Sequence, residues 1–151
     1  DQFGPLKGLE YQKSLERLAF TSGGRTQTAP AQRLVDFVDG KLSTNLNETS
    51  YQPGLNSSPM HSLLPKKIGS RLRKGFDAFG KKMHGYYTNE ANIVGVESRT
   101  SSPVNIPRKE NLEHPEIKGL FPCGEGGGYA GGIVSAAMDG ERCAEAAIQL
   151  L

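Results

Sequence analysis

The sequence has few of the residues that cross-link chains or bind metals. It contains two cysteines, three histidines and no tryptophan among 151 residues. Cys123 and Cys143 form no CxxC pair and the histidines are scattered, so we predict neither a disulfide scaffold nor a metal site. This scarcity is typical of a reducing compartment, and we expect a cytoplasmic location.

A long apolar segment is also missing. No run approaches the roughly 18 residues that a membrane-spanning helix needs, and no signal-peptide pattern opens the chain. We therefore expect no membrane partner. The first residue is Asp1 rather than methionine, and the opening residues resemble the interior of a longer sequence. This favours a segment cut from a larger protein.

Charge of one sign is concentrated in a single segment. Residues 66–83 hold seven basic residues and one acidic residue, a net charge of +6, in a chain that carries +2 overall. Basic helices can bind nucleic acids. Here Phe76 and Phe79 fall on the apolar stripe, where they are not available to stack on bases. A solvated face, or contact with acidic parts of the protein, is therefore favoured over nucleic-acid binding.

Hydrophobic periodicity predicts helices over most of the first 90 residues. Apolar side chains recur at helical spacing in Leu9–Phe20 and Ile68–Met83. Pro30 is placed to open a short helix that runs to Val38 and ends at Gly40. Residues 41–58 are rich in Ser, Thr, Asn, Gly and Pro, which indicates a loop. We predict that residues 1–90 form a mostly helical substrate or cap region.

The pattern changes after residue 91. Residues 93–96, 104–106 and 119–123 are short strand candidates, with a hairpin or crossing pair between the first two. A glycine cluster follows, and then a helix from about Gly131 to Leu151. The predicted fold class is α+β, with residues 91–151 as one domain portion that closes in a strand, a glycine turn and a helix.

The glycine turn is the most informative segment of the sequence. Glycines at this density allow a backbone to approach a ligand closely, and the helix N-terminus that follows favours an anionic group. Gly126–Gly131 matches G-x-G-x-x-G, but that motif needs a further strand with an acidic residue about 20 positions on. We therefore expect a different glycine turn, at the end of a domain.

The final helix carries a stripe of small side chains. This stripe permits a close approach to a sheet or to a cofactor, although tight helix–sheet packing alone also explains it. The residues on this side are Ile133, Ala136, Ala137, Gly140, Ala144, Ala147 and Leu151.

The segment Gly119–Gly140 resembles the C-terminal motif of two-dinucleotide-binding-domain flavoproteins. It contains Leu-Phe-Pro-Cys-Gly-Glu-Gly and then Tyr-Ala-Gly-Gly-Ile. This sequence is similar to that of uncharacterised bacterial FAD-dependent dehydrogenases of the NAD(FAD)-utilising kind. Residues 95–104 and 29–33 are similar to the same family. The resemblance implies the C-terminal part of an FAD-dependent oxidoreductase, with NAD(P)H left open as a second cofactor. Its partners would be the N-terminal FAD-binding portion and a small-molecule substrate.

The resemblance also implies roles for individual residues. Glu125 corresponds to an acidic residue that hydrogen-bonds a ribityl hydroxyl or a phosphate-side group, although many relatives have Asp there. Three glycines would let the backbone pass the cofactor, and three later residues would present N–H groups to the flavin pyrimidine edge. The first set is Gly124, Gly126 and Gly127, and the second is Gly131, Gly132 and Ile133.

Arg99, Ser101 and Ser102 are weaker candidates. A basic residue beside several hydroxyl groups is suited to a carboxylate substrate or to the cofactor, but a polar hairpin turn has the same composition. Cys123 has no partner cysteine near it in sequence, which predicts a buried, inert thiol. Tyr129 is equally suited to packing on a flavin ring and to filling space.

A second function stays open at this stage. The chain would then be a non-catalytic ligand- or partner-binding domain, with the glycine turn as an anion site. Glu125 would repel a phosphate in that turn, so it favours a hydroxyl-rich ligand. Under the flavoprotein interpretation, we expect the chain alone to bind FAD weakly or not at all.

Overall fold

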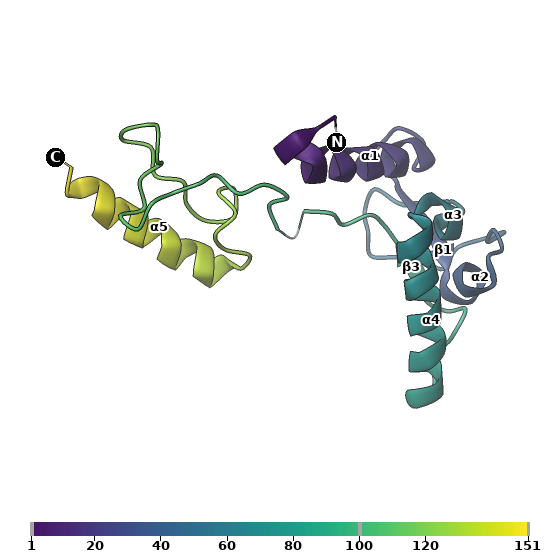
Figure 1. Ribbon diagram of the computed structural model, residues 1–151. Helices are drawn as coiled ribbons and strands as arrows, with labels where there is room; N and C mark the ends of the chain where they lie inside the picture. The colour runs from purple at the N-terminus through teal and green to yellow at the C-terminus, as the bar shows by residue number, and fades with distance from the viewer. Residues whose placement is uncertain (1, 100, 151) are drawn as a thin grey trace. The chain divides into compact units, whose positions relative to one another are not determined.

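The structure, a computed structural model, describes residues 2–99 and 101–150 (Figure 1). Two compact units divide these residues: one is Ser14–Val96, and the other joins residues 2–13 to 97–99 and 101–150. Helices and one small sheet make up the regular structure, which confirms the α+β class. The elements in chain order are η1 Gly4–Leu6, α1 Lys7–Ser22, β1 Ala29–Arg33, α2 Leu34–Asp39, β2 Leu55–Ser57, α3 Met60–Leu63, α4 Lys66–Lys82, β3 Asn92–Val94 and α5 Ile133–Ile148.

Within the described ranges, no helix combines the length and the apolar character needed to cross a membrane. The predicted helices over 9–20 and 68–83 are confirmed as α1 and α4, each with ends within two residues of the expected ones.

A three-stranded sheet forms the centre of the unit Ser14–Val96. Its order is β2-β1-β3, with β1 parallel to β2 and antiparallel to β3. The core lies beside the central strand and includes Ala31, Phe37 and Met60, whose exposed fractions are 0%, 0% and 1%. The loop predicted for 41–58 is therefore wrong at its end, because β2 forms there and Ser58 is buried.

The helix predicted from Pro30 is also wrong in its first half. Pro30 lies in β1, and the helix begins only at Leu34, ending as expected at Gly40 with φ of +73°. Ala29 and Ala31 make the backbone hydrogen bonds to β2, so Pro30 faces the other neighbour. On that side the N–H of Gly95, the residue after β3, donates to the carbonyl of Pro30 at 3.3 Å. Pro30 has no N–H to return the bond, so the β1–β3 ladder ends there.

Aromatic contacts attach α4 to this core. Phe37 and Phe76 meet edge to face with ring centroids 5.9 Å apart, and Phe76 stacks on Tyr86 at 6.4 Å. Phe79 lies nearer the surface, with 47% of its area exposed, so only part of the apolar stripe of α4 is covered. Arg73 closes the contact by donating from Nε to the carbonyl of Val38 at 2.7 Å.

Two glycines of α4 are expected to respond in opposite ways to alanine. A Cβ at Gly75 would meet no atom within 4 Å, so Gly75→Ala should stabilise the helix by up to about 1 kcal/mol. A Cβ at Gly80 would lie 2.5 Å from the Cβ of Tyr87, so Gly80→Ala should destabilise it. Urea unfolding of the two variants checks this prediction, and equal shifts of the same sign would contradict it.

The other unit has one long helix and irregular loops. Residues 104–106 and 119–123 form no strand, so those two strand predictions are wrong, as is a hairpin between 93–96 and 104–106. Instead β3 pairs with β1. The expected final helix is confirmed as α5, although it begins at Ile133 and ends at Ile148.

Candidate functional site

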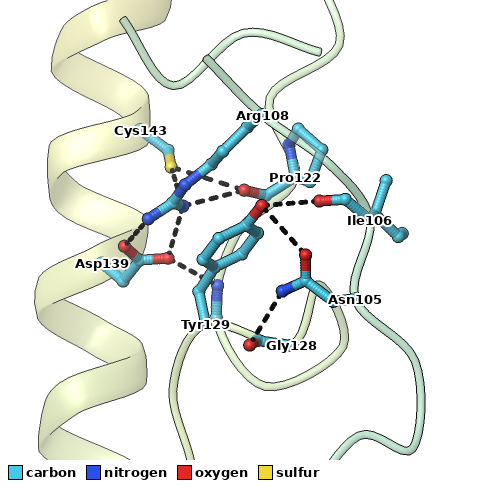
Figure 2. Close-up of polar contacts among 9 residues, drawn as sticks. Asn105, Ile106, Arg108, Pro122, Gly128, Tyr129, Asp139 and Cys143 are labelled. Atoms are coloured by element: carbon cyan, nitrogen blue, oxygen red, sulfur yellow. Dashed lines mark hydrogen bonds and ion pairs between the residues drawn. The ribbon is translucent and has the colours of Figure 1, made fainter. Parts of the chain in front are cut away.

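The glycine-rich turn lies beside the extended segment 104–108. The Ile106 N–H donates to the carbonyl of Gly127 at 3.1 Å. Figure 2 shows a second bond, in which the Asn105 side chain donates to the carbonyl of Gly128 at 3.2 Å. These bonds resemble one rung of a sheet but do not repeat along the chain. They explain why a strand-like sequence at 104–106 forms an irregular contact here.

The turn is also closed by hydrogen bonds of its own. The N–H groups of Gly127, Gly128 and Tyr129 donate to the carbonyls of Cys123, Glu125 and Gly124, at 3.3, 3.0 and 3.0 Å. Gly128 has φ of +84°, a conformation that L side chains rarely adopt. The turn is therefore a compact, defined structure.

An ion pair between Arg108 and Asp139 fixes the turn to α5. The guanidinium donates to both carboxylate oxygens, at 2.9 and 2.8 Å, and the two side chains are only 11% and 9% exposed (Figure 2). The backbone N–H of Gly124 donates to the same carboxylate at 2.9 Å. We call Arg108, Asp139 and Gly124 the turn clamp.

The charge state of the turn clamp follows from these contacts. Hydrogen bonds from Arg108 and then from Gly124 lower the pKa of Asp139 from 3.8 to about 2, against the opposing effect of burial. The hydrogen bond to Asp139 in turn raises the pKa of Arg108. The pair is therefore fully ionised at neutral pH, and its charges compensate each other inside the unit.

Arg108 makes three further contacts that converge on the turn. Its guanidinium lies 3.6 Å from the ring centroid of Tyr129, a cation–π arrangement. It also donates to the carbonyl of Pro122 at 2.9 Å and to Sγ of Cys143 at 3.4 Å. The Tyr129 hydroxyl donates to the carbonyl of Ile106 at 2.7 Å. Tyr129 thus packs on Arg108, which is the role that the structure assigns to it.

A cavity of about 280 Å³ opens on the outer side of the turn. Its walls are Ser101, Ser102 and residues 128–131. Ser102 Oγ donates to the carbonyl of Val104 at 2.8 Å, which holds this serine beside the turn. The structure thus brings Ser101 and Ser102 together with Gly131, three residues that the sequence assigned to binding through two separate segments.

The other predicted site residues do not line this cavity and lie in different environments. Gly124 and Gly127 are buried, whereas Glu125 and Gly126 are exposed. Arg99 is exposed and is not one of the residues that line the cavity. Among the residues that the structure describes, no cluster of three or more His, Cys, Asp or Glu could hold a metal ion.

The N-terminus of α5 continues the same surface. Gly132 and Ile133 are exposed, and the Gly132 N–H donates to Oγ of Ser135 at 3.1 Å. The first N–H groups of any helix have no partner within the helix, and in α5 these groups include those of Ile133 and Val134. Gly131, the last residue of the cavity wall, is followed directly by this helix end.

The inner side of α5 differs from the small-residue stripe predicted for it. Ala137 and Ala144 are exposed, and Leu151 lies outside the described residues. Asp139 and Cys143 are the buried residues of the helix. Asp139 lies at helical spacing from Ala136 and Cys143, and an acidic residue on the buried side of a helix indicates that a basic partner is buried with it. Nothing in one sequence identified Arg108, 31 positions earlier, as that partner.

Cys123 also differs from the prediction. It is exposed rather than buried, although its neighbours Pro122 and Gly124 are buried. Cys143, by contrast, is only 3% exposed. The two cysteines are 20 positions apart in sequence but lie on facing segments of the same unit.

Known proteins of one family are similar to this chain. The family described as "FAD-dependent protein, C-terminal domain-like" matches residues 1–100. A protein of Clostridium beijerinckii, named "Uncharacterized protein", is 42% identical over 147 residues, which cover 96% of this chain. An alignment of that coverage includes the glycine-rich turn. The chain spans 28% of the length of that relative.

Proposed function

Because the chain belongs to the family of FAD-dependent proteins with this C-terminal domain, we propose that its glycine-rich turn closes the flavin site of an oxidoreductase. The cavity beside residues 128–131 is the observation that carries this proposal, since it joins two segments predicted to bind the cofactor. A bound flavin would supply hydride or electron transfer. The residues of this chain would hold and orient it.

The groups around the cavity fit the polar parts of FAD. The serine hydroxyls of the cavity wall suit a hydroxyl-rich ribityl chain, as does the exposed carboxylate of Glu125 elsewhere in the turn, and the glycines present backbone without side chains. The N-terminus of α5 offers N–H groups and a partial positive charge, which stabilise negative charge that develops on a reduced flavin. Arg108 and Asp139 would act by holding the turn rather than by touching the cofactor.

The remainder of the flavin domain would cover the outer face of α5. This face includes Ile133, Val134 and Ile148, which are 93%, 71% and 67% exposed. Apolar side chains exposed along one helix mark a surface that binds another part of a protein. The relative from Clostridium beijerinckii has most of its length outside the matched region, which is enough for a nucleotide-binding domain to supply that partner.

Flavin retention tests the proposal. The longer flavoprotein should purify with FAD, whereas the 151-residue chain alone should show weak or no quenching of FAD fluorescence. Gly126→Val should lower the affinity of the longer protein for FAD about tenfold or more, a loss of about 1.4 kcal/mol. A Cβ at Gly126 meets no atom of the chain within 4 Å, so the loss would arise at the cofactor.

Gly75→Ala is the matched control, because its Cβ also enters open space but belongs to α4, in the other unit. It should leave FAD retention unchanged. A longer protein that purifies without flavin and binds none on titration would contradict the proposal. Binding of inorganic phosphate or a nucleotide by the chain alone, abolished by Gly126→Val, would instead support the alternative of an anion-binding domain.

A further inference from the structure

The two cysteines lie on segments that are held against each other. The carbonyl of Pro122, bonded directly to the nitrogen of Cys123, lies 3.9 Å from Sγ of Cys143. On the other side of Cys123, the N–H of Gly124 donates to Asp139, one helical turn before Cys143. Both neighbours of Cys123 are thus fixed to the part of α5 that carries Cys143 (Figure 2).

The surroundings of Cys143 also affect its charge state. Burial and then the charge of Asp139 raise the pKa of the Cys143 thiol, whereas Arg108 opposes them. The Pro122 carbonyl is joined to the nitrogen of Cys123, so its contact with Sγ places the Cys143 sulfur beside the backbone of Cys123. The pair is therefore a dithiol with one exposed and one buried member.

We propose that Cys123 and Cys143 form a redox-sensitive pair, in which a hydroperoxide oxidises Cys123 and Cys143 then closes a disulfide. This assigns a modification site to the turn, independent of whether a flavin is bound. Cys123 is the first to react because it is exposed. Cys143 is the resolving thiol because it is buried beside Cys123, with the Arg108 guanidinium 3.4 Å from its sulfur to stabilise a forming thiolate.

Both steps balance with hydrogen peroxide as the oxidant. The Cys123 thiolate attacks one peroxide oxygen, the O–O bond breaks, and the departing hydroxide takes a proton to become water. Cys123 is then a sulfenic acid. The Cys143 sulfur attacks the sulfur of Cys123, the S–S bond forms, the S–O bond breaks, and a second water leaves with the proton of Cys143. Two thiols are oxidised and one peroxide is reduced; a small dithiol reverses the change.

The bond would alter the turn clamp as well. Oxidation removes the thiol that Arg108 contacts, and it adds a covalent link from the turn to α5 beside the Gly124–Asp139 hydrogen bond. The oxidised turn should therefore open less often, and the amides of Gly127 and Tyr129 should exchange more slowly with deuterated water.

Thiol counting and peptide mapping test the pair in the 151-residue chain. Before treatment, denatured protein should titrate as two thiols; after hydrogen peroxide it should titrate as none, and both should return with dithiothreitol. Mass spectrometry of unreduced peptides should recover Cys123 and Cys143 in one linked fragment within a monomer. Under native conditions, a brief exposure to iodoacetamide should label Cys123 and spare Cys143.

The single variants separate the roles. Cys143→Ala should let Cys123 accumulate as a sulfenic acid that dimedone traps, whereas Cys123→Ser should leave the remaining thiol unoxidised. Since the first variant removes a buried side chain, the linked fragment in the unaltered chain stands as the decisive measurement. Oxidation of Cys123 alone, or a dimer linked through Cys123 while Cys143 stays reactive in denaturant, would overturn the proposal.

Discussion

Replacing Asp139 with alanine is expected to lower the stability of the unit that contains α5 by about 3 kcal/mol, with the loss centred on the glycine turn. The substitution leaves the Arg108 guanidinium buried without its counter-charge and removes the acceptor of the Gly124 N–H. Hydrogen–deuterium exchange measured peptide by peptide is the suitable test, because it separates this unit from Ser14–Val96. Faster exchange should appear first at residues 122–129.

Asp77→Ala provides the control. Asp77 also forms an ion pair, at 2.7 Å with Lys81, but the two side chains are 55% and 74% exposed. Exposed pairs contribute little to stability, so this variant should be close to the parent. In the double variant Arg108→Met/Asp139→Leu, the cost should be smaller than in Asp139→Ala, because no charge is left buried. Equal exchange in all three variants would refute the role of the turn clamp.

The ion pair between Arg108 and Asp139 also makes the stability of the folded state depend on pH. The folded-state pKa of Asp139 is about 2, below its ordinary value of 3.8, so protonation favours the unfolded state. The contribution is fully present above pH 4 or so, and is lost as the pH falls through the folded pKa. The difference corresponds to about 2 kcal/mol. Asp139→Asn should be less stable at neutral pH and should lack this acid-dependent loss.

Periodicity predicted the long helices because many residues contribute to each pattern. Leu9–Phe20 and Ile68–Met83 have enough apolar positions that no single residue decides the outcome. The strand β1 has only five residues, and its sequence, Ala-Pro-Ala-Gln-Arg, shows no alternation. Its identity depends on pairing with β2 and β3, which are 22 or more positions away. Such pairing is not visible in local sequence.

In the candidate site too, features carried by local sequence were predicted and features that depend on distant residues were not. The glycine turn was readable because six glycines in nine residues serve few other purposes. The turn clamp was not, because Arg108 and Asp139 are ordinary charged residues until the fold buries them together. The proximity of the two cysteines was not predicted for the same reason. A spacing of 20 residues indicated no contact, whereas α5 places Cys143 against the carbonyl of Pro122, which is bonded to Cys123.

Gly128→Ala is expected to open the glycine turn, with a loss of stability of at least about 2 kcal/mol. Two costs combine at this position. An alanine at φ of +84° is strained, and its Cβ would lie 2.6 Å from the carbonyl oxygen of Val104 and 3.0 Å from Cα of Asn105. Both neighbours are backbone atoms, so relief requires segment 104–108 to separate from the turn. The Ile106 amide, which donates to Gly127, should then exchange faster.

Gly126→Ala is the matched control, since Gly126 belongs to the same turn and its Cβ would enter open space. It should leave exchange at Ile106 unchanged. The comparison also separates structure from binding in the longer protein that we propose to bind FAD. Gly128→Ala should lose FAD together with the turn, whereas Gly126→Val should lose FAD with the turn intact. If Gly128→Ala retains normal exchange, the turn is not the rigid element that the cavity requires, and the proposed role of the turn in holding FAD is contradicted.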